Sequence, residues 1–122
     1  MQPTMMSQEA RQMMQQCIRD CEDCHMICMR TVQHCLTMGG DHATPDHIGM
    51  MLDCADACRT SADFMLRNSP NHMLMCSLCA QICDQCAMDC EHLANGDPMM
   101  QECAAKCRQC MESCRKMSPM MN

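Results

Sequence analysis

The sequence predicts an all-α protein: an antiparallel up-down-up-down four-helix bundle with a cysteine-lined core, in one domain over residues 1–122. Two observations support this class. Cysteines recur at alternating steps of three and four residues, which keeps their side chains on one face of a helix. β-Branched and aromatic residues are scarce and nothing alternates with period two, so no strand pattern competes.

Proline marks the predicted helix starts. A capping residue directly precedes proline at three places: Thr44-Pro45, Ser69-Pro70 and Asp97-Pro98. Each pair is typical of an N-cap followed by the first helical residue, because proline lacks only an N–H group that has no helical partner there. We therefore expect helices at about 8–38, 45–67, 70–94 and 98–117.

The predicted helix ends coincide with residues that favour a left-handed or broken backbone. These are Gly39-Gly40, Asn68, Asn95-Gly96 and Ser118-Pro119. The connections between helices are then only a few residues long. Short connections place successive helices antiparallel beside each other, as in an up-down bundle.

The interior of this bundle must be built largely from sulfur. The chain has 16 Cys and 20 Met, whereas Leu, Ile, Val and Phe together number 12, and Trp and Tyr are absent. Such a low content of conventional core residues is normally typical of disordered chains. Sulfur side chains are therefore expected to replace hydrocarbon in the core.

The cysteines form a stripe along each predicted helix, and all of them are expected to face inward. They are Cys17, Cys21, Cys24, Cys28, Cys35, Cys54, Cys58, Cys76, Cys79, Cys83, Cys86, Cys90, Cys103, Cys107, Cys110 and Cys114. Thr31 stands where the pattern of the first helix would give a thiol. The second helix continues its stripe with other residue types: His47, Met51, Ser61 and Met65.

Three interpretations of this stripe compete. Free cysteine can act as a small hydrophobic residue, but sixteen in register with none in the loops exceeds that role. An even cysteine count also suits a disulfide scaffold, although such proteins are loop-rich and connect distant segments. Metal binding is the interpretation that the spacing favours.

Charge favours monovalent copper among the metals. Zinc takes four ligands in a closed tetrahedron, and about four Zn²⁺ ions would neutralise only half the charge of sixteen thiolates. Iron–sulfur ligation is weakly supported, because two CxxC units never follow in succession. Cu(I) is the soft monovalent ion that thiolates and thioethers select. We expect multiple Cu(I) ions, on the order of one per thiol.

Methionine and histidine gather where the cysteine stripes end. The first-to-second and third-to-fourth connections meet at one end of the bundle, and we expect copper to enter there. Four residues are the candidate entrance ligands: His34, Met38, His47 and Met51. Thioethers bind Cu(I) without losing a proton and more weakly than thiolates, which suits a site that passes the ion inward.

A thiol redox protein is a rival of a different class. It needs one thiol pair with a lowered pKa and access to solvent. The candidates nearest to helix ends are Cys76, Cys79 and Cys103, which lie in the same inward stripe as the others. No nucleophile arrangement stands out, so we expect no enzymatic activity.

Composition also argues against several partners and locations. The formal net charge is −6 and no basic run occurs, so a nucleic acid partner is not expected. The longest apolar stretches are a few residues, far below the ~20 of a membrane span. Residues 1–11 show no secretory or twin-arginine signal, and we expect a cytoplasmic protein, although a processed exported chain would look the same.

The pattern resembles the bacterial copper storage protein family. The resemblance covers nearly the whole chain and includes the segments 34–38 and 50–51. It depends mainly on seven CxxxC pairs: Cys17/Cys21, Cys24/Cys28, Cys54/Cys58, Cys79/Cys83, Cys86/Cys90, Cys103/Cys107 and Cys110/Cys114. It implies a cysteine-lined four-helix bundle that stores many Cu(I) ions, admits copper at the Met/His end and assembles into a homotetramer.

We therefore expect a copper storage protein that sequesters, detoxifies and supplies Cu(I), exchanging it with an unspecified donor or acceptor protein. A zinc or cadmium thiolate buffer resembling metallothionein is the alternative of the same kind. A CxxC redox protein and a disulfide-bonded structural protein are the alternatives of other kinds.

Overall fold

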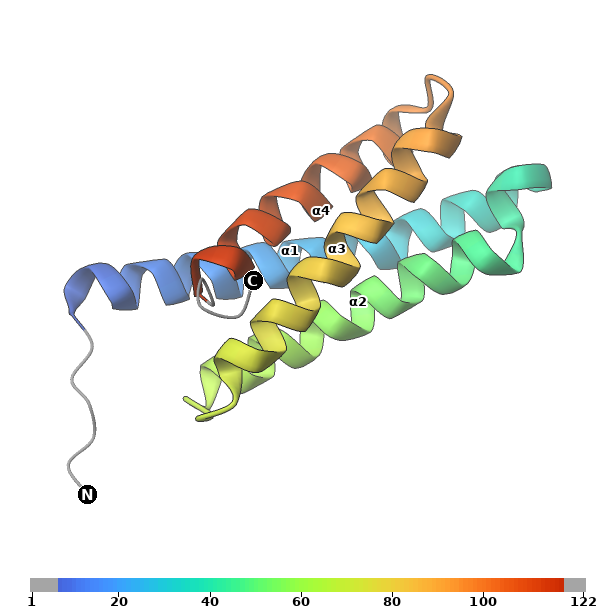
Figure 1. The fold of residues 1–122 in the computed structure, drawn as a ribbon. Coiled ribbons are helices and arrows are strands. Elements are labelled where there is room, and N and C mark those ends of the chain that lie inside the picture. Colours follow the sequence, from blue (N-terminus) through green and yellow to red (C-terminus); the bar gives the residue numbers. More distant parts are fainter. Residues whose placement is uncertain (1–6, 118–122) are drawn as a thin grey trace.

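The computed structural model describes residues 7–117, which form four α-helices and one short 3₁₀ helix (Figure 1). The elements are α1 (Gln8–Met38), η1 (Gly40–Ala43), α2 (Pro45–Leu66), α3 (His72–Ala94) and α4 (Pro98–Met117). The described part of the chain contains no strand. The all-α prediction is confirmed, whereas the predicted helix end at Ser118-Pro119 lies outside the described residues.

Side-chain caps begin α2 and α4 as the sequence predicts. The Thr44 hydroxyl accepts a hydrogen bond from the backbone N–H of His47 at 3.4 Å. One carboxylate oxygen of Asp97 accepts from the N–H groups of Met99 at 2.9 Å and Met100 at 3.1 Å. These oxygens satisfy donors that have no partner within the helix.

The predicted start of the third helix is wrong by two residues. α3 begins at His72, because Pro70 and Asn71 belong to a turn. The Ser69 hydroxyl accepts from the N–H of Asn71 at 3.1 Å, and the Ser69 carbonyl accepts from the N–H of His72 at 3.2 Å. The serine therefore closes the turn and does not cap the helix.

Asn68 ends α2 in a left-handed conformation, with φ of 53°. Its N–H donates to the carbonyl of Met65 at 3.0 Å, and the N–H of Ser69 donates to the carbonyl of Phe64 at 2.9 Å. This pair of bonds is a Schellman motif, which satisfies the last carbonyls of the helix. The helix consequently ends at Leu66, one residue before the predicted end.

Each helix packs against two neighbours, which gives a four-cornered bundle. α1 lies against α2 and α4, and α3 lies against the same two helices. α1 extends beyond the other helices at its N-terminal end (Figure 1). At the opposite end, η1 joins α1 to α2 and residues 95–97 join α3 to α4. The sequence predicts copper entry at this end, and we therefore call it the entrance end.

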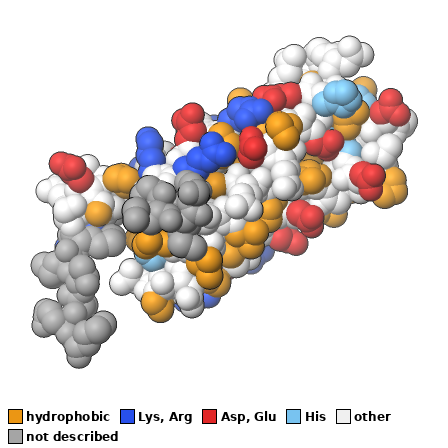
Figure 2. All heavy atoms as spheres, viewed as in Figure 1, with side chains coloured by type: hydrophobic (Ala, Val, Ile, Leu, Met, Phe, Trp, Pro, Cys, Tyr) orange, Lys and Arg blue, Asp and Glu red, His pale blue; other side chains and the backbone are white. Residues whose placement is uncertain are grey.

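Cys, Ala and Met residues dominate the buried interior. Several leucine and methionine side chains lie on the outside, where Leu74, Leu78 and Met88 are exposed. Figure 2 shows hydrophobic side chains along the outer surface among charged ones. Within residues 7–117, no helix is both long and apolar enough to cross a bilayer.

One buried polar cluster lies outside the cysteine core and joins α1 to α4. The Asp20 carboxylate is 4% exposed and accepts hydrogen bonds from Gln16 at 3.0 Å and Gln109 at 2.9 Å. It also accepts one from the Ser113 hydroxyl. A buried carboxylate with several donors fixes how two helices sit against each other.

Candidate metal centre

All 16 cysteine side chains point into the bundle and are fully buried, at 0% exposure. The predicted inward orientation is therefore confirmed for every one of them. Each of these side chains is a thiol. We call this set of sixteen thiols the sulfur column, because it follows the long axis of the bundle.

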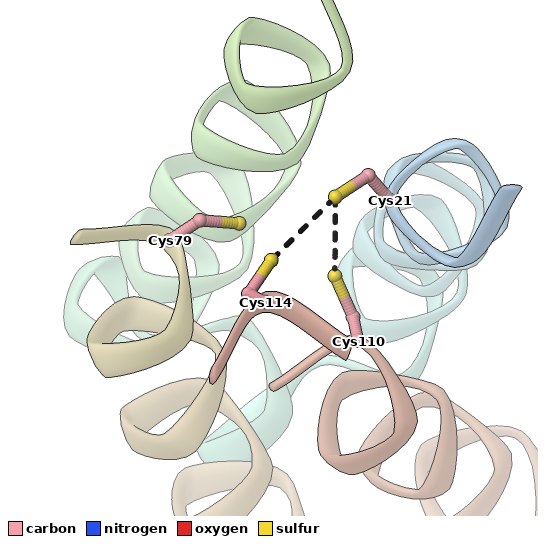
Figure 3. A group of neighbouring side chains, drawn as sticks. All are labelled: Cys21, Cys79, Cys110 and Cys114. Atoms are coloured by element: carbon pink, nitrogen blue, oxygen red, sulfur yellow. Dashed lines mark hydrogen bonds between the residues drawn. The ribbon is translucent and has the colours of Figure 1, made fainter. Parts of the chain in front are cut away.

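Neighbouring sulfurs in the column are within van der Waals and weak hydrogen-bond range. Their Sγ···Sγ distances run from 3.6 to 3.9 Å, and nearly all join different helices. Figure 3 shows one such group, in which Cys21 of α1 faces Cys110 and Cys114 of α4, with Cys79 of α3 beside them. The four helices thus bring together ligands that are far apart in the sequence.

The thiols form overlapping sets in which every Sγ atom lies within 4.8 Å of the others. Four sets contain four thiols: Cys21, Cys79, Cys110 and Cys114; Cys24, Cys28, Cys54 and Cys107; Cys24, Cys54, Cys58 and Cys83; Cys58, Cys79, Cys83 and Cys110. A fifth set contains three thiols: Cys17, Cys76 and Cys114. Because the sets share members, the twelve thiols in them form one continuous group and do not divide into separate tetrahedral sites.

Shared protons shift the pKa values of the thiols in opposite directions. Hydrogen bonds to Cys114 and Cys21, together with burial, hold the pKa of Cys110 above its ordinary value. The bond that Cys21 accepts from Cys110 lowers the pKa of Cys21. Hydrogen bonds to Cys110 and Cys114 lower the pKa of Cys79 to about 3. Neighbouring thiols that share protons therefore titrate as a group, and a bound cation must displace their protons.

The column suits soft monovalent ions. Each thiolate buried without a partner costs several kcal/mol, so every proton lost must be matched by positive charge. One monovalent ion per lost proton keeps the interior neutral. Sulfur ligands select Cu(I) among such ions, and the short spacing allows one sulfur to be shared by two ions.

At the entrance end the column meets a histidine. His47 is 1% exposed, and its Nε2 atom lies 3.4 Å from the Sγ atom of Cys35. The Nδ1 atom of His47 is 2.5 Å from a carboxylate oxygen of Asp89. Burial, followed by the charges of Asp97, Cys103 and Asp89, raises the pKa of Cys35 to about 11. Cys35 is therefore protonated at neutral pH, and a bound metal must displace that proton.

The other predicted entrance residues are placed differently from one another. Met51 is fully buried on the same helix as His47, whereas Met38 is 56% exposed. His34 is partly buried and pairs through Nε2 with Asp97 at 2.7 Å. His47 is within hydrogen-bond range of a cysteine of the column, and Met51 is buried in the same core as the cysteines.

Sequence reasoning missed one contact at this end and left one buried methionine out of the candidate ligands. Asp89 precedes Cys90 in an unremarkable position, and nothing in the sequence connects it with His47, 42 positions away. Met100 is fully buried. It lies three residues before Cys103, which is the helical spacing of the stripe and would have indicated an inward position.

The fold and this site define a four-helix bundle with an interior of metal-binding thiols. The chain belongs to the copper storage protein family, whose profile it matches over residues 10–119. It is 33% identical over 102 residues to a Bacillus subtilis protein described as the uncharacterized cysteine-rich protein YhjQ. The matched region covers 84% of this chain and 93% of that protein.

Two solved structures share the architecture. Nmul_A1745 of Nitrosospira multiformis is 44% identical, with a TM-score of 0.84 over 90% of this chain and 98% of that one. The Cu(I)-bound copper storage protein BsCsp3 is 33% identical, with a TM-score of 0.78 over 84% of this chain and 94% of that one. The resemblance inferred from the CxxxC pairs is confirmed.

Proposed function

We propose that this protein stores Cu(I) without catalysing a reaction, binding many ions through the thiolates of the sulfur column. The observation that carries this function is the continuity of the column. All 16 thiols are buried, and the sets of close sulfurs overlap. Family membership and similarity to a Cu(I)-bound structure support the choice of copper. Ions held there are kept from water and from other proteins.

The burial of the thiols argues against the redox alternative. A thiol oxidoreductase needs a nucleophilic sulfur that a substrate can reach. Cys79 has a lowered pKa but is 0% exposed, and its predicted partner Cys76 is equally buried. Cys76 and Cys79 are buried and share close sulfur neighbours, as expected for metal ligands. This supports a non-enzymatic role.

The distribution of charge supports entry of copper at the entrance end. The segments 31–58 and 85–105 contain Asp41, Asp46, Asp89, Glu91 and Asp97 among their acids, and neither contains Lys or Arg. Figure 2 shows acidic and histidine side chains gathered at this end. A cation therefore meets an attractive potential here. Behind it lie His47 and Met51 as proposed ligands, with His34 and Met38 at the rim.

Assembly and location complete the proposal. Exposed hydrophobic side chains, such as Leu74, Leu78 and Met88, offer apolar surface for contacts between copies in a homotetramer. A cytoplasmic location suits a chain with sixteen cysteines, because the cytosol keeps thiols reduced. A copper donor or acceptor protein is the candidate partner for exchange.

An anaerobic competition titration tests the proposed function. Cu(I) is added to the reduced full chain in the presence of a competing chelator, and the chelator signal reports the copper that the protein withholds. We expect many equivalents to be withheld, on the order of one per thiol. Saturation near about four equivalents, or displacement of copper by Zn²⁺, supports the zinc buffer instead. Loss of free thiols in air without metal, and no copper withheld, supports a disulfide scaffold.

A further inference from the structure

Two histidines at the entrance end bond to carboxylates, but through different ring nitrogens. His34 uses Nε2 to reach Asp97 at 2.7 Å, whereas His47 uses Nδ1 to reach Asp89 at 2.5 Å. Asp97 also accepts the backbone N–H groups that begin α4. The His34–Asp97 pair therefore belongs to the N-terminal cap of α4, whereas the His47–Asp89 pair orients a histidine beside the sulfur column.

The bond to Asp89 determines where the proton of His47 resides. An ionised carboxylate only accepts hydrogen bonds, so Nδ1 of His47 must carry the proton that is shared with Asp89. In a neutral imidazole the other nitrogen, Nε2, then has a free lone pair. That lone pair lies 3.4 Å from the Sγ atom of Cys35, at the end of the sulfur column.

We propose that Asp89 is a positioning residue for a mixed nitrogen and sulfur Cu(I) site formed by His47 and Cys35. This inference rests on the proposed function, because it assigns one more role at the copper entrance. Asp89 holds the tautomer and the ring orientation of His47 so that Nε2 faces Cys35. A carboxylate behind a metal-binding histidine fixes the ring in this way and makes it a stronger ligand.

The chemistry of binding balances. As Cu(I) bonds to Sγ of Cys35, the thiol proton leaves to solvent, and Nε2 of His47 supplies the second electron pair. Copper remains Cu(I), and the thiolate charge neutralises it. Nδ1 of His47 keeps its proton throughout and donates it in the hydrogen bond to Asp89. Its side chain is 33% exposed while that of His47 is 1% exposed, so the pair reaches from the surface to the column.

Without Asp89, no acceptor stabilises the His47 tautomer that carries its proton on Nδ1. A buried Nδ1–H without an acceptor is unfavourable, and the proton is better placed on Nε2, where it can be donated to the sulfur of Cys35. Nε2 then has no lone pair for copper. Asp89→Ala should therefore abolish nitrogen ligation, while Asp89→Asn, whose amide oxygen still accepts, should retain part of it.

The test is ¹⁵N NMR of the reduced full chain with ¹⁵N-labelled histidine. The signals of His47 are assigned by their loss in His47→Gln. We expect the apo protein to show Nδ1 protonated and Nε2 unprotonated, and the Nε2 resonance to shift on adding Cu(I). In Asp89→Ala the tautomer should change and the Nε2 resonance should not respond to Cu(I). Asp84→Ala, which removes another partly exposed acid of α3, is the matched control and should behave as the parent chain.

Three results would overturn the inference. These are a protonated Nε2 in the parent apo chain, no response of that atom to Cu(I) in the parent chain, or an unchanged response in Asp89→Ala. The first two need no substitution of Asp89, so they decide the matter even if Asp89→Ala fails to fold. A parent chain that withholds copper from the chelator but shows no Nε2 response refutes this inference alone. A chain that withholds no copper refutes the proposed function.

Discussion

The Sγ atoms of Cys21 and Cys110 lie 3.6 Å apart, although 89 positions separate the two residues in the sequence. The contact joins α1 to α4, and Cys21 also lies 3.7 Å from Cys114. Contacts of this kind fill the interior where other bundles have leucine. Packing and ligation therefore use the same side chains, and substitutions can distinguish the two roles.

A substitution of Cys107 distinguishes the packing role of the cysteines from their role as ligands. The sulfur of Cys107 lies 3.7 Å from Cys24, 3.8 Å from Cys54 and 3.9 Å from Cys28. Cys107→Ala should lower the free energy of unfolding of the apo protein by about 1 kcal/mol, as a small buried deletion does. The Cu(I) capacity should fall by more than one ion, because several ions share this sulfur. Cys35→Ala, at the end of the column, should lose one ion at most; equal losses in both variants would contradict shared ligation.

Thr31 interrupts the column between Cys28 and Cys35. It is fully buried, and its hydroxyl donates to the carbonyl of Ile27 at 2.7 Å. Thr31→Cys supplies a thiol at a stripe position and should raise the Cu(I) capacity by about one ion, measured by competition with a chelator. Thr31→Val has similar shape without sulfur and should leave the capacity unchanged. A gain in both variants, or in neither, would count against the stripe as the determinant of capacity.

Asp20 tests stability without touching the column. Asp20→Ala leaves the Gln109 amide and the Ser113 hydroxyl without their acceptor, so the free energy of unfolding should fall by about 1–3 kcal/mol. Chemical denaturation of the apo protein measures this loss. The Cu(I) capacity of the folded variant should equal that of the parent chain, and a reduced capacity would show that the polar cluster also supports metal binding.

Asp97 links stability to pH. The hydrogen bond from His34, with those from the backbone of Met100 and Met99, lowers the pKa of Asp97. A lowered folded-state pKa contributes stability that is present above the ordinary aspartate value of about 4 and is lost as pH falls through the folded value. Asp97→Ala should therefore be less stable than the parent apo protein by about 1 kcal/mol at pH 7, and the difference should shrink in acid. A difference that stays constant between pH 7 and pH 2 would contradict this assignment.

The sequence was sufficient for the repetitive features of this molecule. A periodic stripe is a local pattern, so the helices and the inward direction of every cysteine followed from it. The left-handed Asn68 followed from its residue type at a helix end. Ser69 was misjudged because a serine before proline can close a turn as well as cap a helix. The Asp89–His47 pair depends on how α2 meets α3, a relation between distant residues for which a single sequence carries no periodic signal.

Native mass spectrometry of the Cu(I)-loaded protein tests the central claim most directly, because it counts ions and displaced protons together. The reduced chain is loaded anaerobically, and the mass gives both the number of copper ions and the number of thiol protons lost. We predict a number of ions approaching the 16 thiols, with one proton lost for each ion bound. Saturation near about four ions, or loss of two protons for each ion, would contradict a column neutralised by monovalent copper.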